Sequence, residues 1–272
     1  MGRLVFAGAT SHVGAILKNP DAHPESSVRL HAAWDRMAAE ISEADPDVVL
    51  VIATDHYETF RLEHYPTFCL GLAESYDAWG EYGNPEGTVA GAPETGAAIL
   101  ADLVRHGFDV SRSHEMLLDH AFMVPIIRLG LVDRPVLPLF VNCNTAPLPT
   151  LDRAAQLGSA LRAAVESLPG DVSVAVIATG GVSHWVGLPQ FGQVNDAWDR
   201  RFLATVDEGD LDAIVSLSDE EVLEEAGNGA LEIRTWVAAL ACAGATGAET
   251  YAYEPMPDWA IGIGIVRMEV GA

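Results

Sequence analysis

The pattern of apolar positions divides the chain into buried strands and amphipathic helices. Val-, Ile- and Leu-rich runs that are bounded by turn or polar residues occupy 3–9, 47–54, 135–141 and 172–179. These runs are continuously apolar, which is typical of central strands covered on both faces. Apolar residues at helical spacing predict helices over 28–43, 93–107, 150–167, 195–206 and 229–244. The alternation of the two patterns predicts an α/β layered fold.

Two further segments complete this organisation. The stretch 77–94 is rich in Gly and Pro and is long enough to be a functional loop. Residues 255–270 predict a final strand that returns to the edge of the sheet. No linker-like composition separates the segments, so we expect one domain over residues 1–272.

Composition and charge narrow the classes of function. Of the 272 residues, 49% are hydrophobic and 20% are charged, which is typical of a globular chain with a sizeable core. The formal net charge is −24, and such a field repels nucleic acid and acidic membranes. We therefore expect neither as a partner. The same field would repel an anionic ligand, so a carboxylate ligand would need locally placed Arg residues.

Cysteine usage and hydropathy predict a cytoplasmic protein. Cys69, Cys143 and Cys242 are odd in number and lack CxxC spacing, which argues against a disulfide framework or a structural zinc site. With no adjacent base, they are interpreted as inert packing residues. The apolar runs are too short to span a bilayer, and the N-terminal residues do not resemble a signal peptide.

The stretch GATSHVG, residues 8–14, resembles the turn of a dinucleotide-binding motif but fails its requirements. The position that needs a glycine for close approach to pyrophosphate is Ser11. Pro20 and Pro24 also prevent a long helix from following the turn. The remaining feature is a histidine, His12, at the carboxyl end of a strand.

Histidines recur at the ends of the predicted strands. His56 follows VLVIATD, His184 follows VAVIATGGVS, and Asp119-His120 lies in the polar cluster LLDH. In an α/β sheet the carboxyl ends of the strands form the ligand-binding edge. A single histidine of this kind is more often structural. Their repetition, however, predicts a metal and acid–base site where His12, His56, His120 and His184 meet.

Two histidines and one carboxylate would form a facial triad, which leaves positions open for substrate and dioxygen on Fe(II). The candidate carboxylate is Glu232, which opens the most apolar predicted helix. An acid in the first turn of a helix also simply favours the helix dipole. A buried acid would, however, require a cation. From the residues alone the two interpretations of Glu232 are equally supported.

The same residues resemble a known family. The motifs SHVG, PDVVLVIATDHY, LLDHAFMVP, VLPLFVNCNTAPLPT, GGVSH, LEIRTWVAALA and MPDWAIGIG occur in order between residues 3 and 267. Together they resemble the class III extradiol ring-cleavage dioxygenases, and most of all the 2,3-dihydroxyphenylpropionate 1,2-dioxygenase branch. After GGVSHW this chain passes quickly to FGQVNDAWDRRFL, where the phenylpropionate enzymes carry a long insertion. The substrate is therefore not implied by the resemblance.

The resemblance implies a three-layer α/β/α fold with a central, mostly parallel or mixed sheet. It implies Fe(II) bound by His12, His56 and Glu232. It also implies acid–base roles for His184 and His120, with Asp119 orienting His120. The expected reaction inserts both atoms of O2 into a small aromatic diol beside its hydroxyl groups. Which histidine is the base and which the acid is left open, and we favour His184 as the base.

Alternatives remain at this point. A substrate of the 2-aminophenol or the protocatechuate and gallate type would use a similar site. A metal-dependent hydrolase would also use His and carboxylate ligands, although it usually needs more carboxylates around the metal than this sequence offers. A non-catalytic relative that keeps only the fold is a third class. We expect a homo-oligomer and leave open whether a small partner subunit covers the site.

Overall fold

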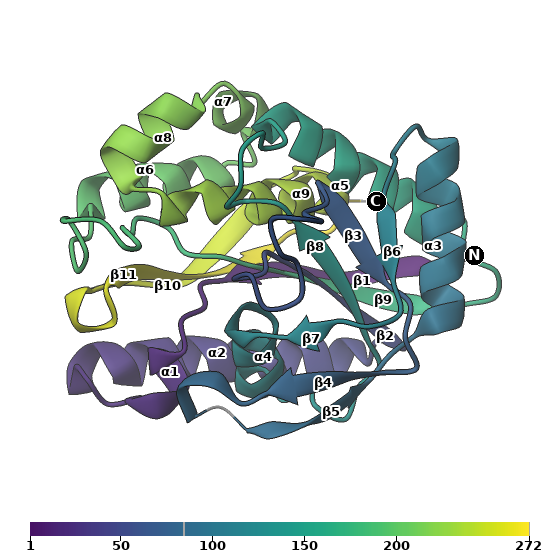
Figure 1. Cartoon of the computed structure of the whole chain (residues 1–272), viewed down its shortest axis with the longest axis horizontal. Helices are drawn as coiled ribbons and strands as arrows, with labels where there is room; N and C mark the ends of the chain where they lie inside the picture. The colour runs from purple at the N-terminus through teal and green to yellow at the C-terminus, as the bar shows by residue number, and fades with distance from the viewer. Residues whose placement is uncertain (84, 272) are drawn as a thin grey trace.

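The computed structural model describes residues 1–83 and 85–271, and a mixed eight-stranded sheet forms the centre of this part of the chain (Figure 1). The strand order across the sheet is β10 (Ala248–Met256), β11 (Ile261–Met268), β1 (Arg3–Thr10), β9 (Ser173–Thr179), β2 (Val48–Ala53), β8 (Val136–Val141), β3 (Phe68–Gly71) and β6 (Ser111–Ser113). The four central strands, β1, β9, β2 and β8, run parallel to one another. Their carboxyl ends therefore lie at one edge of the sheet.

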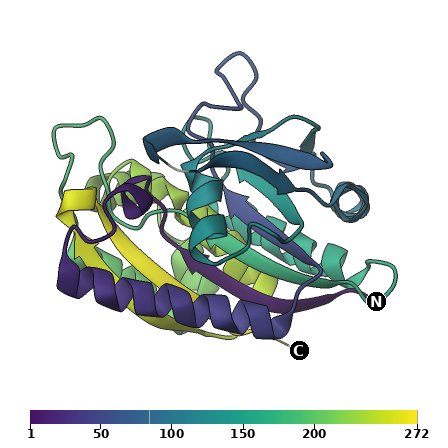
Figure 2. The same cartoon turned by 90° about the horizontal axis from the view of Figure 1, so that it is seen from below.

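Helices cover both faces of the sheet, which gives the expected three layers (Figures 1 and 2). One core cluster packs the sheet against α3, α5, α6, α7, α8 and α9, and a second packs its other face against α2 and α4. The helices span α1 (Ala15–Lys18), α2 (Pro24–Ala44), α3 (Pro93–Arg105), α4 (His120–Arg128), α5 (Leu151–Glu166), α6 (Asp196–Asp207), α7 (Leu211–Val215), α8 (Asp219–Ala226) and α9 (Ile233–Ala243), with short 3-10 turns at η1 (Glu81–Gly83), η2 (Gly229–Glu232) and η3 (Pro257–Trp259). None of the helices in the described ranges is long and apolar enough to cross a membrane.

Burial explains why the predicted strands read as continuously apolar. Every residue of β2, β8 and β9 is buried, because helices cover both faces of these strands. α2 is different, since it buries only one stripe, which includes Leu30, Trp34, Met37 and Ile41. The two periodicities thus reflect a sheet covered on both sides and helices that face water on one side.

Two parts of the fold differ from the sequence-based expectation. The C-terminal strand β11 is not at the edge, because it lies antiparallel between β1 and β10. The segment 77–94, expected as a loop, contains part of a second sheet in which β4 (Ser75–Trp79) pairs with β5 (Glu86–Ala90) and β7 (Leu117–Leu118). This small sheet packs beside α4, and the turn η1 within the segment reaches the candidate site.

Candidate metal centre

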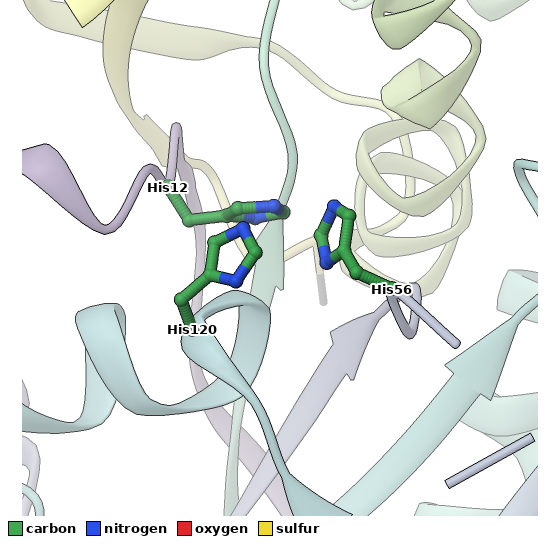
Figure 3. Close-up of side chains that lie close together, drawn as sticks. All are labelled: His12, His56 and His120. Carbon is green, nitrogen blue, oxygen red and sulfur yellow. The ribbon is translucent and has the colours of Figure 1, made fainter. Parts of the chain in front are cut away.

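The carboxyl ends of β1, β9 and β2 deliver three of the predicted site histidines to one place. His12 follows β1, His184 follows β9, and His56 follows β2, with β9 lying between the other two strands. His120 is the first residue of α4, and its ring lies against those of His12 and His56. The rings of His12, His56 and His120 point toward one another (Figure 3), and their ligand atoms lie within 4.8 Å of each other.

Glu232 completes this cluster from η2, directly before α9. Its Oε1 lies 3.6 Å from His12 Nε2 and 3.4 Å from His56 Nε2, and its Oε2 lies 3.9 Å from His184 Nε2. The carboxylate is 2% exposed, and no Lys or Arg of the described chain pairs with it. Burial opposes its ionisation, yet His12 and the other two histidines hold the pKa of Glu232 well below its usual range. Besides these imidazoles, the carboxylate contacts the Gly181 backbone nitrogen, which donates to Oε2 at 2.7 Å. A buried carboxylate surrounded by imidazoles is suited to a cation.

Hydrogen bonds select which nitrogen of His12 faces Glu232. The Oγ1 of Thr179 donates to the carbonyl oxygen of Ala121 at 2.8 Å, so this hydroxyl must accept from His12 Nδ1, 3.2 Å away. His12 Nδ1 therefore carries the proton and Nε2 presents its lone pair. Burial lowers the pKa of His12 to about 3, which keeps this ring neutral at neutral pH.

His56 is oriented by Asp119. The Oδ2 of Asp119 lies 2.8 Å from His56 Nδ1 and accepts from the backbone nitrogen of His56 at the same distance. Because a carboxylate only accepts, Nδ1 carries a proton and Nε2 faces Glu232. Burial opposes protonation of the ring, but Asp119 and Glu232 outweigh it and raise the pKa of His56 well above its usual value. The raised pKa means that the ring also tends to hold a proton on Nε2, and a metal ion bound at Nε2 would displace that proton.

The sequence predicts that Asp119 orients His120; in the structure the hydrogen bonds of Asp119 run to His56 and to the Ala121 nitrogen. Asp119 is the N-cap of α4, and its Oδ1 accepts from Ala121 N at 2.9 Å, which directs its other oxygen to His56. The carboxylate at His120 is Glu81 in η1, whose Oε1 lies 2.5 Å from His120 Nδ1 and also accepts from the His120 backbone nitrogen. Asp119 and Glu81 thus perform matching roles for two different rings.

His184 is buried beside Glu232 and also presents Nε2 toward that carboxylate. Its Nδ1 lies 2.9 Å from the carbonyl oxygen of Val182, which can only accept, and burial lowers the pKa of the ring. Two glycines make room for it: a Cβ at Gly181 would lie 2.3 Å from its Cε1, and one at Gly229 would lie 2.1 Å from its Nε2. Gly181 does not adopt a positive φ, so the lack of a side chain there serves to leave space for the ring.

The four histidines and Glu81 line a cavity of about 580 Å³. Its walls are mostly apolar, and they include Val13, Ala15, Tyr57, Trp185, Val186, Phe191, Trp259 and Ile261. A cavity of this size with apolar walls and a few convergent polar groups suits a small aromatic ligand.

Two residues that contact the cluster were not singled out from the sequence: Thr179 and Glu81. Thr179 ends an apolar strand, where its side chain gives no pattern of its own. Glu81 lies in the Gly- and Pro-rich segment whose composition predicts function without indicating which residue performs it.

Cys69, Cys143 and Cys242 are buried, and burial raises the pKa of each thiol, to about 12 for Cys69 and Cys242.

Comparison with known proteins places this geometry in a family. Residues 7–264 match the catalytic LigB subunit of aromatic ring-opening dioxygenase. The chain is 31% identical over 281 residues to a 2,3-dihydroxyphenylpropionate/2,3-dihydroxicinnamic acid 1,2-dioxygenase from Burkholderia vietnamiensis, an alignment that covers 85% of this chain and 87% of the relative. An enzyme with the same name from Photorhabdus laumondii is 28% identical over 309 residues and 96% of each chain.

A solved structure supports the fold independently. The crystal structure of an uncharacterized Escherichia coli K12 protein aligns with a TM-score of 0.58 at 14% identity, over 88% of this chain and 91% of that one. At this identity the likeness concerns the fold alone. The family match extends over nearly the whole chain, and it agrees with the resemblance seen in the sequence. This chain is a member of the LigB family of aromatic ring-opening dioxygenases.

Proposed function

We propose that this chain is an Fe(II)-dependent extradiol dioxygenase that inserts both atoms of O2 into a catechol-type substrate. We propose residues 1–272 as its catalytic domain. The observation that supports this most directly is that four histidines converge at one largely apolar cavity and that the buried carboxylate of Glu232 contacts three of them. The named relatives act on 2,3-dihydroxylated aromatic acids, so a catechol ring is the substrate class that we infer.

The proposed metal ligands are His12, His56 and Glu232. The donor set fits Fe(II), because two neutral imidazole nitrogens and one carboxylate form the 2-His-1-carboxylate set of non-haem oxygenases. His120 lies close enough to offer a third imidazole. We favour Glu232 because its Oε1 faces both ligand histidines and its charge offsets that of a divalent cation, whereas Glu81 engages His120. When bound, Fe(II) supplies Lewis acidity toward the catechol oxygens and the redox capacity to use dioxygen.

His184 is the proposed general base and His120 its acid partner. His184 is neutral because burial lowers its pKa. Its Nε2 faces the Glu232 carboxylate, and the residue lines the cavity. A neutral imidazole in this place can accept the proton of a catechol hydroxyl. His120 lines the same cavity from α4, and Glu81 would balance the positive charge that His120 gains when it carries a proton. In this proposal Asp119 and Thr179 orient the ligand rings and do not touch substrate.

Anaerobic loading with Fe(II), followed by oxygen uptake on a panel of substituted catechols and 2-aminophenols, tests this proposal. We expect stoichiometric O2 consumption with catechols and a yellow ring-opened product. A protein that binds Fe(II) but opens none of these rings would contradict it. The homo-oligomeric state and the cytoplasmic location stay predictions, and whether a small partner subunit covers the site stays open. Light scattering of the purified protein measures the oligomeric state.

A further inference from the structure

Lys18 is the only lysine of the 272-residue chain, and it lines the candidate active-site cavity. Among the described residues around that cavity it is also the only Lys or Arg. It ends α1, a single turn that follows directly on the segment carrying His12. The proposed ligand and the only ammonium group of a side chain thus belong to one short stretch of chain at one cavity.

No carboxylate of the described chain pairs with Lys18 within ion-pair distance, although three acids line the same cavity. Asp258 pairs with His23, with 2.6 Å between Oδ2 and Nε2, and Glu81 contacts His120. Glu58 is the third. A lysine at the end of a helix often serves only the helix dipole, but α1 has four residues and hence little dipole. Lys18 is exposed at the cavity, and its charge is hydrated there without a carboxylate partner among the described residues.

The remaining cavity walls are apolar and shaped by aromatic side chains, with Trp185, Phe191 and Trp259 among them. Such walls suit the ring and aliphatic parts of a ligand but cannot recognise a charge. The net charge of −24 makes binding of an anion electrostatically unfavourable unless a local cation offsets it. A carboxylate ligand would need a local cation in this field, and among the described lining residues Lys18 is the one that can supply it, since no Arg is present there.

We propose that Lys18 forms a subsite for an anionic substituent, a carboxylate, carried by the aromatic substrate away from its reacting hydroxyl groups. This inference rests on the proposed function. The ammonium group donates to the carboxylate from the cavity wall while the histidine cluster receives the diol. Lys18 thereby acts as a specificity-determining residue and takes no part in the ring-opening chemistry.

A matched pair of substrates tests the subsite through the ratio of two kcat/KM values. The pair is 2,3-dihydroxyphenylpropionate and its methyl ester, which differ in charge but share the catechol ring. Lys18→Gln should lower the ratio for the acid over the ester about tenfold, equivalent to about 1.4 kcal/mol, mainly through KM for the acid. Lys18→Arg should restore most of the ratio. Arg3→Gln is the charge control, since Arg3 is exposed and pairs with Asp171 at the other end of β1. An unchanged ratio in Lys18→Gln, or an equal loss in Arg3→Gln, would overturn the proposal.

A second measurement does not depend on turnover. Because the chain has one lysine, an amine-acetylating reagent can modify only Lys18 and the N-terminus, and peptide mass spectrometry separates the two. Under anaerobic conditions with Fe(II) present, the acid should slow acetylation of Lys18 severalfold more than the ester does. The N-terminal amine should be unaffected. Equal protection by both compounds, or by neither, contradicts the subsite. If the wild type opens neither ring, the proposed function has failed, and the protection assay still decides the role of Lys18.

Discussion

Asp119 joins the loop after β2 to the start of α4 through His56. One carboxylate oxygen accepts from both the ring Nδ1 and the backbone nitrogen of His56, each at 2.8 Å, and the other caps α4. Burial opposes ionisation of this acid, but His56 outweighs it and lowers the pKa of Asp119 to about 2. Asp119 is therefore a carboxylate under all physiological conditions. It fixes both the proton and the orientation of one proposed metal ligand.

Asp119→Asn should weaken Fe(II) binding about 10- to 100-fold, the usual effect of losing the partner of a ligand histidine. The amide can still accept from Ala121 N, so we expect the fold to persist. Anaerobic titration with Fe(II) measures the affinity. Thr150→Ala is a matched control, because Thr150 caps α5, contacts none of the proposed ligands and does not line the cavity, so its loss should cost about 1 kcal/mol of stability without affecting iron. Unaltered Fe(II) affinity in Asp119→Asn would contradict the proposed role.

Glu232→Gln should abolish the stabilisation that Fe(II) gives to the protein. The amide oxygen can still accept from the Gly181 nitrogen, a bond of 2.7 Å in the structure, so the variant loses charge but little volume. In the wild type, Fe(II) at 100 times its Kd should add about 2.7 kcal/mol to the free energy of unfolding. The iron-dependent rise in Tm should be near zero in the variant. If the two proteins show the same rise, Glu232 serves only the helix dipole.

His184→Ala separates a base from a ligand and from a packing residue. If His184 is the base, the variant keeps iron and loses about 10²- to 10⁴-fold in kcat on a catechol. A ligand role predicts loss of iron instead. A packing role predicts a lower Tm with normal turnover of the folded fraction. Iron content, Tm and turnover are measured on one preparation, and a stable, iron-loaded, fully active His184→Ala enzyme would refute our assignment.

The strand-end histidines could be predicted because the fold leaves their positions little freedom. His12, His56 and His184 follow parallel neighbouring strands, whose carboxyl ends meet at one edge. The apolar runs indicated those strands to within a residue or two. Periodicity alone thus located three of the residues, and the family resemblance gave them their expected roles.

The carboxylates could not be assigned in the same way. Asp119 is adjacent to His120 in sequence, but its N-cap conformation turns it toward His56, and only the three-dimensional structure shows this. Glu81 reaches His120 from a segment with no apolar periodicity. The position of β11 was missed because an apolar run does not indicate which strands lie on either side of it.

Another buried acid, Asp199, holds the residue next to the proposed base. Asp199 of α6 is fully buried and accepts from the backbone nitrogen and the hydroxyl of Ser183, at 2.7 and 2.8 Å, and from the hydroxyl of Tyr253 at 2.7 Å. It therefore fixes the residue that precedes His184. Burial raises the pKa of Asp199 to about 6 despite these donors, and the nearby charge of Asp196 adds to the rise. Arg200 lies over the Tyr253 ring and forms its ion pair with Asp196.

Asp199→Asn should therefore gain stability relative to the wild type as the pH rises. The folded protein binds this proton more tightly than the unfolded chain does. The contribution of Asp199 to stability thus falls between the ordinary pKa of 3.8 and about 6, and it stays lost above that range. The amide can accept from the Ser183 nitrogen and donate to either hydroxyl, and it does not titrate. The stability difference between variant and wild type should rise by about 2 kcal/mol from pH 4 to pH 7, measured by urea unfolding. A difference independent of pH would mean that the hydrogen bonds of Asp199, and not its burial, determine its ionisation.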